Sequence, residues 1–315
     1  MKKFLFILDP LESLNLPMDS SLKLAAALGT CGAVLAYCTF KDLFWLGGSS
    51  AAANVTELRC RYVPHQNSEI QLGVQRLQQL DAFDVILMRK DPPFNLDYVV
   101  CTWFLDTVAN KSLVINHPEA LRNLNEKLSI FKFNPGMEKG LVSLSASQIY
   151  AYIREECAGD AIVKPLLEFG GRQVTRVQLG NDKLVDLQLL KELTWEDSQF
   201  RMVQCFNKHI FQGEGRFFIL NGKILNACLK VPRAGSFLAN TGQGAVLAPY
   251  QASPTLEAKI NELAIFLLKQ KVFLAGVDCI GENISEINIT SPRLLAPTSD
   301  IRPYYQEMAS VLLAL

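Results

Sequence analysis

The first third of the chain alternates short apolar runs with stretches whose apolar residues recur at helical spacing. Residues 20–28 and 98–108 carry the helical pattern. The apolar runs, which predict buried strands, are residues 4–9, 33–38, 84–89 and 113–116. Strands that alternate with helices predict a doubly wound α/β unit with a parallel sheet over roughly residues 1–120.

The middle of the chain changes to a mixed pattern of helix and short strands. Residues 145–156 predict a helix, with Ser145 as its N-cap. Short strands are expected at residues 161–165, 172–177 and 202–206. This part of the chain is therefore expected to be α+β.

From Gly215 onward the pattern becomes that of an antiparallel sheet. Asn221 and Gly222 separate two apolar runs, which is a strong hairpin signal. A later helix is predicted because apolar residues recur along one helical face: Leu256, Ile260, Leu263 and Leu267. The segment from Asp300 to Leu315 is expected to be a closing helix.

Composition narrows the class of protein. The 315 residues include 31 Lys+Arg and 31 Asp+Glu, so the formal net charge is zero. This balance gives no general electrostatic attraction to nucleic acid or to an anionic membrane. No uncharged apolar run approaches the ~20 residues that a membrane helix needs, and the N-terminal run is too short for a signal peptide. We therefore expect a soluble, cytoplasmic protein with no nucleic-acid or membrane partner.

The eight cysteines are widely spaced, and most lie inside apolar segments. In a chain of this length, buried free thiols in a reducing compartment are expected rather than a disulfide framework. The histidines His65, His117 and His209 share no metal-ligand spacing. The sequence also lacks the phosphate-loop motif GxxxxGK[ST] and the zinc motif HExxH.

Residues 276–292 carry the most informative chemistry, because two short strands there flank a turn around Glu282. A hairpin symmetric about residue 282 places Asp278 opposite Glu286, with Cβ atoms ~5 Å apart. The period of two puts Asn288 on the face of Glu286. Opposed carboxylates are unfavourable unless a positive charge lies between them. Two carboxylates and an amide oxygen suit Mg²⁺ shared with phosphates, and the alternative is a solvated face of an edge hairpin.

A nucleotide bound beside such a metal needs further positive charge. Lys127 lies in an Asn-Glu-Lys-Leu stretch, and Lys164 ends an apolar strand, where its burial is costly without an anionic partner. Gly170 and Gly171 would let backbone N–H groups approach a phosphate. Arg216 begins a strand. Each residue taken alone is also compatible with an ordinary solvated side chain, so it is their order along the chain that is informative.

That order, together with several local strings, resembles the bacterial-type glutathione synthetases, which are ATP-grasp ligases. The strings include MRKDPPF (88–94), INHPEALRNLNEKL (115–128), EGR (214–216) and VDCIGENISEINITSP (277–292). The resemblance implies an N-terminal doubly wound α/β (pre-ATP-grasp) domain followed by an ATP-grasp fold of two α+β subdomains. The expected parts are a substrate-side domain at 1–122, a lid subdomain at 123–200 and a metal-carrying subdomain at 201–315.

The resemblance also implies a role for individual residues. It places ATP on Lys127, Lys164, Gly170, Gly171, Gln204, Cys205 and Phe206, the last three forming the adenine-side hinge. It places catalysis on Arg216 and Lys230, the latter where the family has arginine. It places the peptide substrate near Asp19, Ser20, Arg89, Asp91 and Asn240. It places the metal on Asp278, Glu286 and Asn288, the trio already indicated by strand periodicity.

The reaction implied by the resemblance uses ATP to phosphorylate the cysteinyl carboxylate of γ-glutamylcysteine. The amine of glycine then attacks the acyl phosphate, giving glutathione, ADP and phosphate. The expected cofactors are ATP and Mg²⁺, with Mn²⁺ as a substitute, and the expected state is a homo-oligomer. Positioning and charge neutralisation supply most of what phosphoryl transfer requires. A mobile glycine-rich lid is expected, because water must be kept from the acyl phosphate.

The sequence departs from the family pattern in two loops. Leu167 and Glu168 stand where the family has Asp-Gly, and Leu238 or its neighbour stands where an arginine is expected in the loop at 232–245. These changes leave two alternatives open. One is an ATP-grasp ligase that joins another carboxylate to another amine. The other is a nucleotide-binding homologue without turnover.

Overall fold

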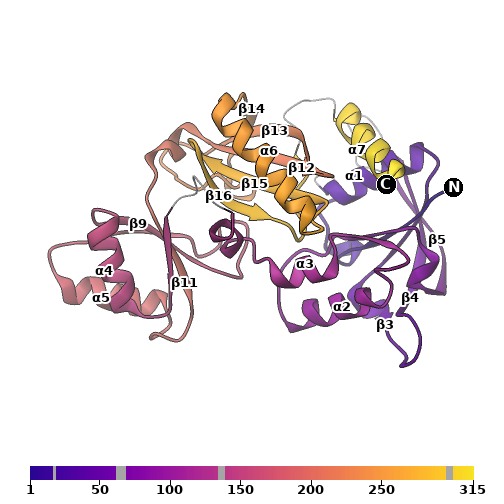
Figure 1. Ribbon diagram of the computed structural model, residues 1–315, viewed down its shortest axis with the longest axis horizontal. Helices are drawn as coiled ribbons and strands as arrows, with labels where there is room; N and C mark the ends of the chain where they lie inside the picture. The colour runs from indigo at the N-terminus through magenta and orange to yellow at the C-terminus, as the bar shows by residue number, and fades with distance from the viewer. Residues whose placement is uncertain (17–18, 62–68, 134–138, 296–300) are drawn as a thin grey trace.

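The computed structural model describes residues 1–16, 19–61, 69–133, 139–295 and 301–315. The strands form three sheets of seven, four and five strands. Figure 1 shows them side by side, with the N-terminal sheet on the right, the five-stranded sheet in the middle and the four-stranded sheet on the left. The α/β and α+β fold class predicted from the sequence is confirmed.

The N-terminal sheet has a parallel part in the order β2-β1-β6-β7. Its strands are β1 (Lys3–Ile7), β2 (Val34–Cys38), β6 (Val85–Met88) and β7 (Leu113–Ile115). The helices beside it are α1 (Ser20–Thr30) and α2 (Leu96–Asp106). Phe4 and Phe6 lie in one hydrophobic core with α1, whereas Leu5 and Ile7 lie in another with α2. The two helices therefore cover opposite faces, as predicted for a doubly wound unit.

The sheet is mixed rather than wholly parallel, because three further strands pair antiparallel at one side. They are β3 (Leu43–Phe44), β4 (Ala52–Arg61) and β5 (Glu69–Gln79). The sequence pattern did not predict them. Almost every side chain of β5 is exposed, including Leu72, Val74 and Leu77. A strand with no buried face produces no alternation of apolar and polar residues.

The four-stranded sheet is antiparallel, in the order β10-β9-β11-β8. Its elements are β8 (Gly140–Ser143), α4 (Ala146–Glu156), β9 (Asp160–Pro165), β10 (Thr175–Gln178), α5 (Lys183–Leu193) and β11 (Arg201–Cys205). The Ser145 side chain caps α4 by accepting a hydrogen bond from the Gln148 backbone N–H, as predicted. The strand expected from residue 172 begins at Thr175. The pairing places β11 with this sheet, across the expected division at 200/201, and the three-part division itself stays a prediction.

The five-stranded sheet has the order β14-β13-β12-β15-β16. Its elements are β12 (Glu214–Leu220), β13 (Lys223–Val231), β14 (Val246–Pro249), α6 (Pro254–Lys269), β15 (Leu274–Ile280) and β16 (Asn283–Asn288). Asn221 and Gly222 form the predicted hairpin turn, and both have positive φ. The predicted face of α6 is confirmed, since Leu256, Ile260 and Leu263 are fully buried, as is Leu267 one turn further on.

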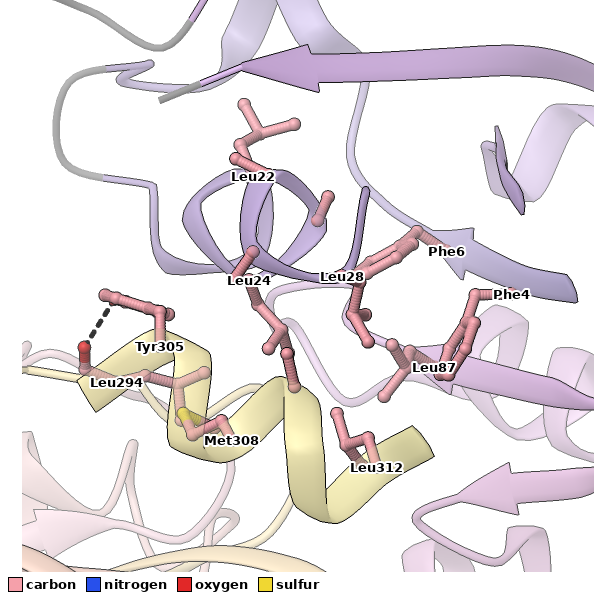
Figure 2. Close-up of a cluster of buried hydrophobic side chains, with 14 of the residues drawn as sticks. Phe4, Phe6, Leu22, Leu24, Leu28, Leu87, Leu294, Tyr305, Met308 and Leu312 are labelled. Carbon is pink, nitrogen blue, oxygen red and sulfur yellow. Dashed lines mark hydrogen bonds between the residues drawn. The ribbon is translucent and has the colours of Figure 1, made fainter. Parts of the chain in front are cut away.

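The last helix, α7 (Arg302–Ala314), packs against the first helix of the chain. Figure 2 shows Met308 and Leu312 of α7 facing Leu24 and Leu28 of α1 within one buried core. The Tyr305 hydroxyl donates a hydrogen bond to the backbone oxygen of Leu294 at 2.7 Å. The closing helix was predicted, and the structure shows that it completes the N-terminal core. Asp300, where the helix was expected to begin, lies outside the described residues.

One buried side chain fixes the N-terminal sheet to the five-stranded sheet. Asn116 follows β7, and its Nδ2 donates to the backbone oxygens of Leu274 and Ile289, both at 2.6 Å. Its Oδ1 accepts from the backbone N–H groups of Phe273 and Leu274, both at 2.8 Å. Because all these polar groups are paired, the junction is both buried and satisfied.

The remaining helices are short. They are α3 (Pro118–Asn123) and the 3-10 turns Leu11–Ser13, Phe40–Asp42, Leu80–Ala82, Leu128–Phe131, Lys208–Gln212 and Thr241–Gln243. In the described parts of the chain, no helix has both the length and the apolar character needed to cross a bilayer.

Met308→Ala tests the contact between the last and first helices. Met308 is fully buried, so we expect truncation to lower the free energy of unfolding by about 2–5 kcal/mol. Equilibrium denaturation in urea measures the change. Glu307→Ala on the same helix is the control, because Glu307 is exposed and its removal should matter by about 0.5 kcal/mol or less. Equal losses in the two variants would show that α7 does not pack as described.

Candidate active site

Two clefts meet between the four-stranded and five-stranded sheets. The first, which we call the nucleotide cleft, runs from β9 and β11 to Asp278 and Glu286. The second, the substrate cleft, lies between Asp91 of the N-terminal domain, Arg216 and the residues that follow β16. Residues that line both clefts are Phe169, Gly170, Arg172, Asn240 and Glu286.

The structure brings the residues expected to bind ATP into one place. All of them line the nucleotide cleft: Lys127, Lys164, Gly170, Gly171, Gln204, Cys205 and Phe206. Lys164 on β9 lies opposite Met202 of β11, two residues before Gln204. These side chains come from segments up to 79 residues apart (206 − 127), so the fold has gathered them.

A buried network of charges lies where the clefts approach each other. Arg216 of β12 pairs in register with Asp278 of β15, and its Nε and Nη2 contact the two carboxylate oxygens at 2.5 and 2.6 Å. Lys230 of β13 pairs in register with Glu214 of β12. The Lys230 Nζ lies 2.8 Å from Asp278 Oδ1 and 2.5 Å from Glu214 Oε2. Two cations and two carboxylates therefore neutralise one another in the sheet.

These contacts shift the pKa values of the groups in different directions. Burial alone would raise the pKa of Asp278, but Arg216 and Lys230 outweigh it and hold that pKa below its usual value. Burial raises the pKa of Glu214, and Lys230 only partly offsets this. Burial would lower the pKa of Lys230, but the charges of Asp278 and Glu214 raise it. Asp278 therefore remains ionised and Lys230 remains charged.

The predicted opposition of Asp278 and Glu286 is confirmed. It arises differently from the symmetric turn that was assumed. Ile280 pairs with Asn283, so the turn is two residues long, and a bulge then shifts the register so that Asp278 meets Glu286 rather than Ser285. The extra residue restores the expected pair.

Glu286 and Asn288 extend this centre toward the substrate cleft. The Lys127 Nζ lies 3.2 Å from Glu286 Oε1. Burial alone would raise the pKa of Glu286, but Lys127 and Lys164 bring it below its usual value. The Asn288 Nδ2 donates to the Gly276 backbone oxygen at 3.3 Å and to Asp278 Oδ2 at 3.2 Å. Both bonds are made by the amide nitrogen, so neither uses the amide oxygen.

Residues expected on the peptide side divide into two groups. Asp91 and Asn240 line the substrate cleft. Asp19, Ser20 and Arg89 are not among the described residues that line either cleft. The buried guanidinium of Arg89 donates to the hydroxyls of Ser20 and Ser21 and, at 3.0 Å, to the backbone oxygen of Pro292, which does line the cleft. Asp19 caps α1, and burial raises its pKa.

The sequence reasoning missed several polar residues of the site. Glu126 accepts hydrogen bonds from the backbone N–H groups of Ile289 and Thr290 and from the Thr290 hydroxyl at 2.7 Å. It joins the segment before Lys127 to the end of β16. Glu214 balances Lys230, and its place two residues before Arg216 on one strand is a signal that period-two reasoning could have used. Arg172, directly after Gly170 and Gly171, was also not singled out.

The two loops that depart from the family pattern touch each other. The Gln243 Nε2 donates to the Gly170 backbone oxygen at 3.4 Å. A Cβ atom at Gly171 would come within 2.5 Å of Asn240 Oδ1, so glycine is needed for this approach. Leu167 is 55% exposed, whereas Leu238 lines the nucleotide cleft. Glu168, which follows Leu167, also lines the nucleotide cleft, so both departures change a wall of that cleft.

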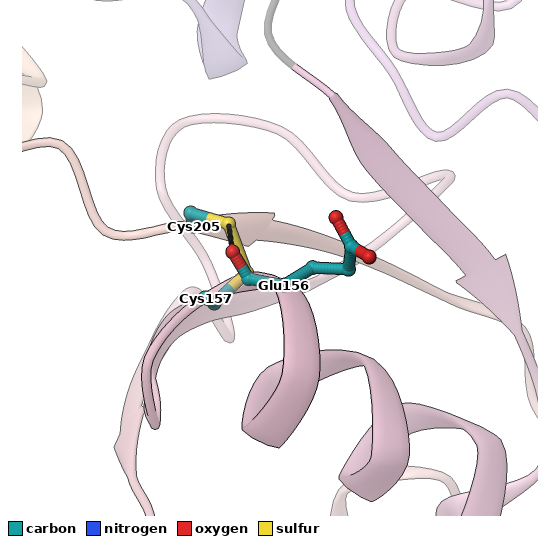
Figure 3. The surroundings of a disulfide bond; sticks show 3 residues. All are labelled: Glu156, Cys157 and Cys205. Atoms are coloured by element: carbon teal, nitrogen blue, oxygen red, sulfur yellow. Dashed lines mark hydrogen bonds between the residues drawn. A yellow bond between two sulfur atoms is a disulfide. The ribbon is translucent and has the colours of Figure 1, made fainter.

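The expectation of free thiols is wrong for one pair of cysteines. Cys157, which ends α4, forms a disulfide with Cys205 at the end of β11 (Figure 3). The other six cysteines are free, and all of them except Cys31 are buried. The two partners are 48 residues apart, and only the packing of α4 on the sheet brings their Cα atoms within 4.8 Å. The disulfide adjoins the nucleotide cleft, which Cys205 lines.

Comparison with solved structures identifies the fold. The fold is similar to that of D-cycloserine synthetase DcsG, with a TM-score of 0.67 at 14% identity over 98% of this chain and 99% of that one. It is also similar to a Chryseobacterium gregarium RiPP-associated ATP-grasp ligase, with a TM-score of 0.62 at 14% identity over 100% of this chain and 97% of that one. The fold is therefore that of the ATP-grasp ligases.

Comparison of sequences defines the family. The model of the prokaryotic glutathione synthetase N-terminal domain matches residues 2–122, and that of the prokaryotic glutathione synthetase ATP-grasp domain matches residues 126–301. The glutathione synthetase of Yersinia pestis is 33% identical over 298 residues, covering 93% of this chain and 90% of that protein. That of Parasynechococcus marenigrum (strain WH8102) is 33% identical over 290 residues, covering 91% of each. The chain belongs to the prokaryotic glutathione synthetase family, which confirms the resemblance.

Counting thiols tests the disulfide. Eight cysteines less the two in the Cys157–Cys205 bond leave six, so alkylation of the unreduced, denatured protein should add six labels by mass spectrometry. Reduction beforehand should raise the number to eight. Cys205→Ser should give seven labels without reduction, because it frees Cys157, and Cys31→Ser should give five. Eight labels on the unreduced wild type would rule the bond out.

Lys230→Met tests the buried charge network. Removing one partner leaves buried carboxylates uncompensated, so we expect the free energy of unfolding at about pH 7 to fall by about 3–5 kcal/mol. Without Lys230, the folded-state pKa of Glu214, already raised by burial, rises further, and Asp278 loses one of the two cations that lower its pKa. A group whose pKa is raised in the folded state destabilises the fold increasingly as pH rises. The difference in free energy of unfolding between wild type and variant should therefore narrow as the pH falls toward about 5.

Denaturation at both pH values measures this effect. Lys223→Met is the matched control, since Lys223 lies on the same strand with an exposed side chain. It should change stability by about 0.5 kcal/mol or less at either pH. A deficit for Lys230→Met that is independent of pH would show that the lost contact is packing rather than charge.

Proposed function

We propose that this protein joins γ-glutamylcysteine to glycine at the expense of ATP, releasing ADP and phosphate. The proposal rests on one observation in a chain of this family. The two clefts meet at a buried centre whose positive and negative charges balance. One cleft holds the residues expected to bind the nucleotide, and the other opens toward the N-terminal domain. The full-length family match favours this function over the two alternatives, a different acceptor and loss of turnover.

Each part of the nucleotide has a proposed partner in the first cleft. Lys127 and Lys164 neutralise phosphate charge, and Gly170 and Gly171 offer backbone N–H groups at close approach. Gln204, with Cys205 and Phe206, lies at the end of β11 and lines the far part of the cleft, where the adenine would bind. Binding then aligns the γ-phosphate with the meeting point of the clefts.

ATP-grasp ligases use ATP with a divalent metal, and we propose that Mg²⁺ binds to Asp278, Glu286 and Asn288. The donor set fits, because it offers carboxylate oxygens together with the amide oxygen of Asn288, which neither bond of its amide nitrogen uses. The described residues contain no group of three or more histidine, cysteine, aspartate and glutamate side chains suited to a metal. Phosphate oxygens of the nucleotide would complete the site. When bound, the metal neutralises phosphate charge.

Arg216 and Lys230 are the proposed catalytic cations. Asp278 and Glu214 hold them in place before substrate arrives, so no reorganisation is needed as charge develops on the transferred phosphate. In the first step a cysteinyl carboxylate oxygen bonds to the γ-phosphorus as the bond to ADP breaks. In the second, the glycine nitrogen bonds to the acyl carbon, phosphate leaves, and the nitrogen releases a proton.

The two touching loops are proposed to shield the acyl phosphate from water. Gln243 and Asn240 of one loop meet Gly170 and Gly171 of the other beside both clefts. Leu238 contributes an apolar wall on the nucleotide side. Exclusion of water strengthens the electrostatic contacts and protects the intermediate from hydrolysis. Asp91 and Asn240 are proposed to bind polar groups of the peptide. Arg89 donates to the backbone oxygen of Pro292 and so holds this part of the cleft wall in place.

Three finer points are proposed on the family resemblance. Mn²⁺ would substitute for Mg²⁺, because both take oxygen ligands. The protein would act in the cytoplasm. It would form a homo-oligomer, and the exposed apolar residues Leu72, Val74 and Leu77 of β5 support this, because they give the N-terminal sheet an uncovered apolar edge.

Glu286→Gln tests the proposed reaction and metal site together. The wild type should release ADP only when ATP, Mg²⁺, γ-glutamylcysteine and glycine are all present, with glutathione as the product. The variant keeps the size of the side chain but removes its charge, so we expect turnover to fall by about 10²-fold or more. Coupled ADP release and chromatography of glutathione measure both quantities.

Glu282→Gln is the matched control, because it lies in the turn of the same hairpin with an exposed side chain. It should retain wild-type turnover. Release of ADP by the wild type that needs neither γ-glutamylcysteine nor glycine would overturn the proposed reaction. Wild-type turnover in Glu286→Gln would instead overturn the metal assignment.

A further inference from the structure

Arg172 occupies a position that no other cation of the site shares. Five described residues line both clefts: Phe169, Gly170, Arg172, Asn240 and Glu286. Arg172 carries the only positive charge among them. A phosphoryl group that passes from ATP in one cleft to a carboxylate in the other must cross this boundary. We propose that Arg172 binds the γ-phosphate of ATP at the boundary of the clefts and holds it during transfer.

The local backbone explains how Arg172 reaches the boundary. The Arg172 backbone N–H donates to the Phe169 backbone oxygen at 3.3 Å, which closes a four-residue turn. The two central residues, Gly170 and Gly171, have φ of 65° and 75°. Positive φ at both central positions is a geometry that glycine adopts without steric cost. The pair of glycines thus reverses the chain and returns Arg172 to the side of Phe169.

The side chain of Arg172 lies over an aromatic ring at the same boundary. Its guanidinium carbon is 4.7 Å from the centroid of the Phe169 ring. A cation stacked on a ring keeps its N–H groups in the plane of the guanidinium, where they can still donate to an anion. Stacking therefore orients the guanidinium and leaves its N–H donors available to an anion.

Three other cations of the clefts are already paired with carboxylates. Arg216 and Lys230 contact Asp278, and Lys127 contacts Glu286. Arg293 donates to the Thr241 hydroxyl and lines the substrate cleft, not the nucleotide cleft. Within the described parts of the chain, Arg172 has no carboxylate within ion-pair distance. A triphosphate adds more negative charge than the neutralised pairs can balance. Arg172 supplies a charge that is not offset by its surroundings.

A phosphoryl group is a better ligand for this position than a substrate carboxylate. A carboxylate of the peptide or of glycine would lie in the substrate cleft alone, whereas Arg172 also lines the nucleotide cleft. Arginine matches phosphate oxygens with two parallel N–H groups, and such charge-assisted bonds are about twice as strong as neutral ones. The γ-phosphate is the one group of the proposed reaction that belongs to both clefts in turn.

Nucleotide affinities test the proposal. Arg172→Gln should raise the dissociation constant of a non-hydrolysable ATP analogue about tenfold, the loss of one charge-assisted contact, while that of ADP stays within about twofold. Titration calorimetry with Mg²⁺ measures both. For Arg172→Lys, the dissociation constant of the ATP analogue should lie between those of the wild type and Arg172→Gln, because lysine keeps the charge but lacks the two parallel N–H donors. In the ligation assay, kcat should fall while the KM for glycine stays unchanged.

Arg154→Gln is the matched control, because Arg154 is an exposed arginine on α4 that stacks on Tyr150, away from both clefts. It should leave the affinities and turnover unchanged, and circular dichroism should show every variant to be folded. Equal weakening of both nucleotides by Arg172→Gln would indicate a structural role for the loop. Unchanged affinities and turnover would also overturn the proposal.

The direction of transfer rests on the proposed function, but the two can fail separately. If the wild type makes no glutathione while Arg172→Gln weakens the binding of the ATP analogue and not that of ADP, the ligation is wrong and the role of Arg172 stands. If the wild type makes glutathione and the variant binds both nucleotides normally with normal kcat, the ligation stands and the role of Arg172 is wrong.

Discussion

Asp278 is buried between two cations, and the geometry of the site depends on keeping it there. A carboxylate in a sheet interior is costly unless it is paired and hydrogen-bonded. Arg216 and Lys230 meet that requirement only while β12, β13 and β15 keep their observed register. In general, replacing a buried ion pair by well-packed apolar side chains is often neutral or stabilising. Under the proposed function these charges hold two cations ready for a phosphate, and the fold is constrained because it must keep them paired.

The rest of the molecule positions this centre against the two clefts. Asn116 ties the end of the N-terminal sheet to β15 and to the residue after β16. Glu126 ties the segment before Lys127 to Ile289 and Thr290, so the wall of the substrate cleft is fixed at both ends. The glycine turn at Gly170 and the loop around Asn240 close over the boundary. The sheets thus carry the paired charges, and the two loops line the boundary of the clefts.

The residues of the hairpin at 276–292 show how far local pattern reaches. Hairpin symmetry correctly placed Asp278 opposite Glu286, and period two put Asn288 on the face of Glu286. It could not foresee that Arg216 would lie opposite Asp278 on the other side, because β12 is 62 residues away in the chain. The bulge was also invisible, since a two-residue turn with one extra residue gives the same pairing as a symmetric turn. The sequence pattern predicted which residues lie together, whereas the bulge that aligns them is seen only in the structure.

The sequence by itself indicated most strands and helices with a buried face and, through the resemblance, the family and seven of the residues that line the nucleotide cleft. These depend on periodicity and on short motifs, which are properties of neighbouring residues. Only the tertiary structure decided what depends on distant partners: the Cys157–Cys205 bond, the antiparallel edge with β5, and the packing of α7 on α1. It also decided that Arg172 stands where the clefts meet. Contacts between residues far apart in the chain leave no local pattern, so they appear only when the sheets are assembled.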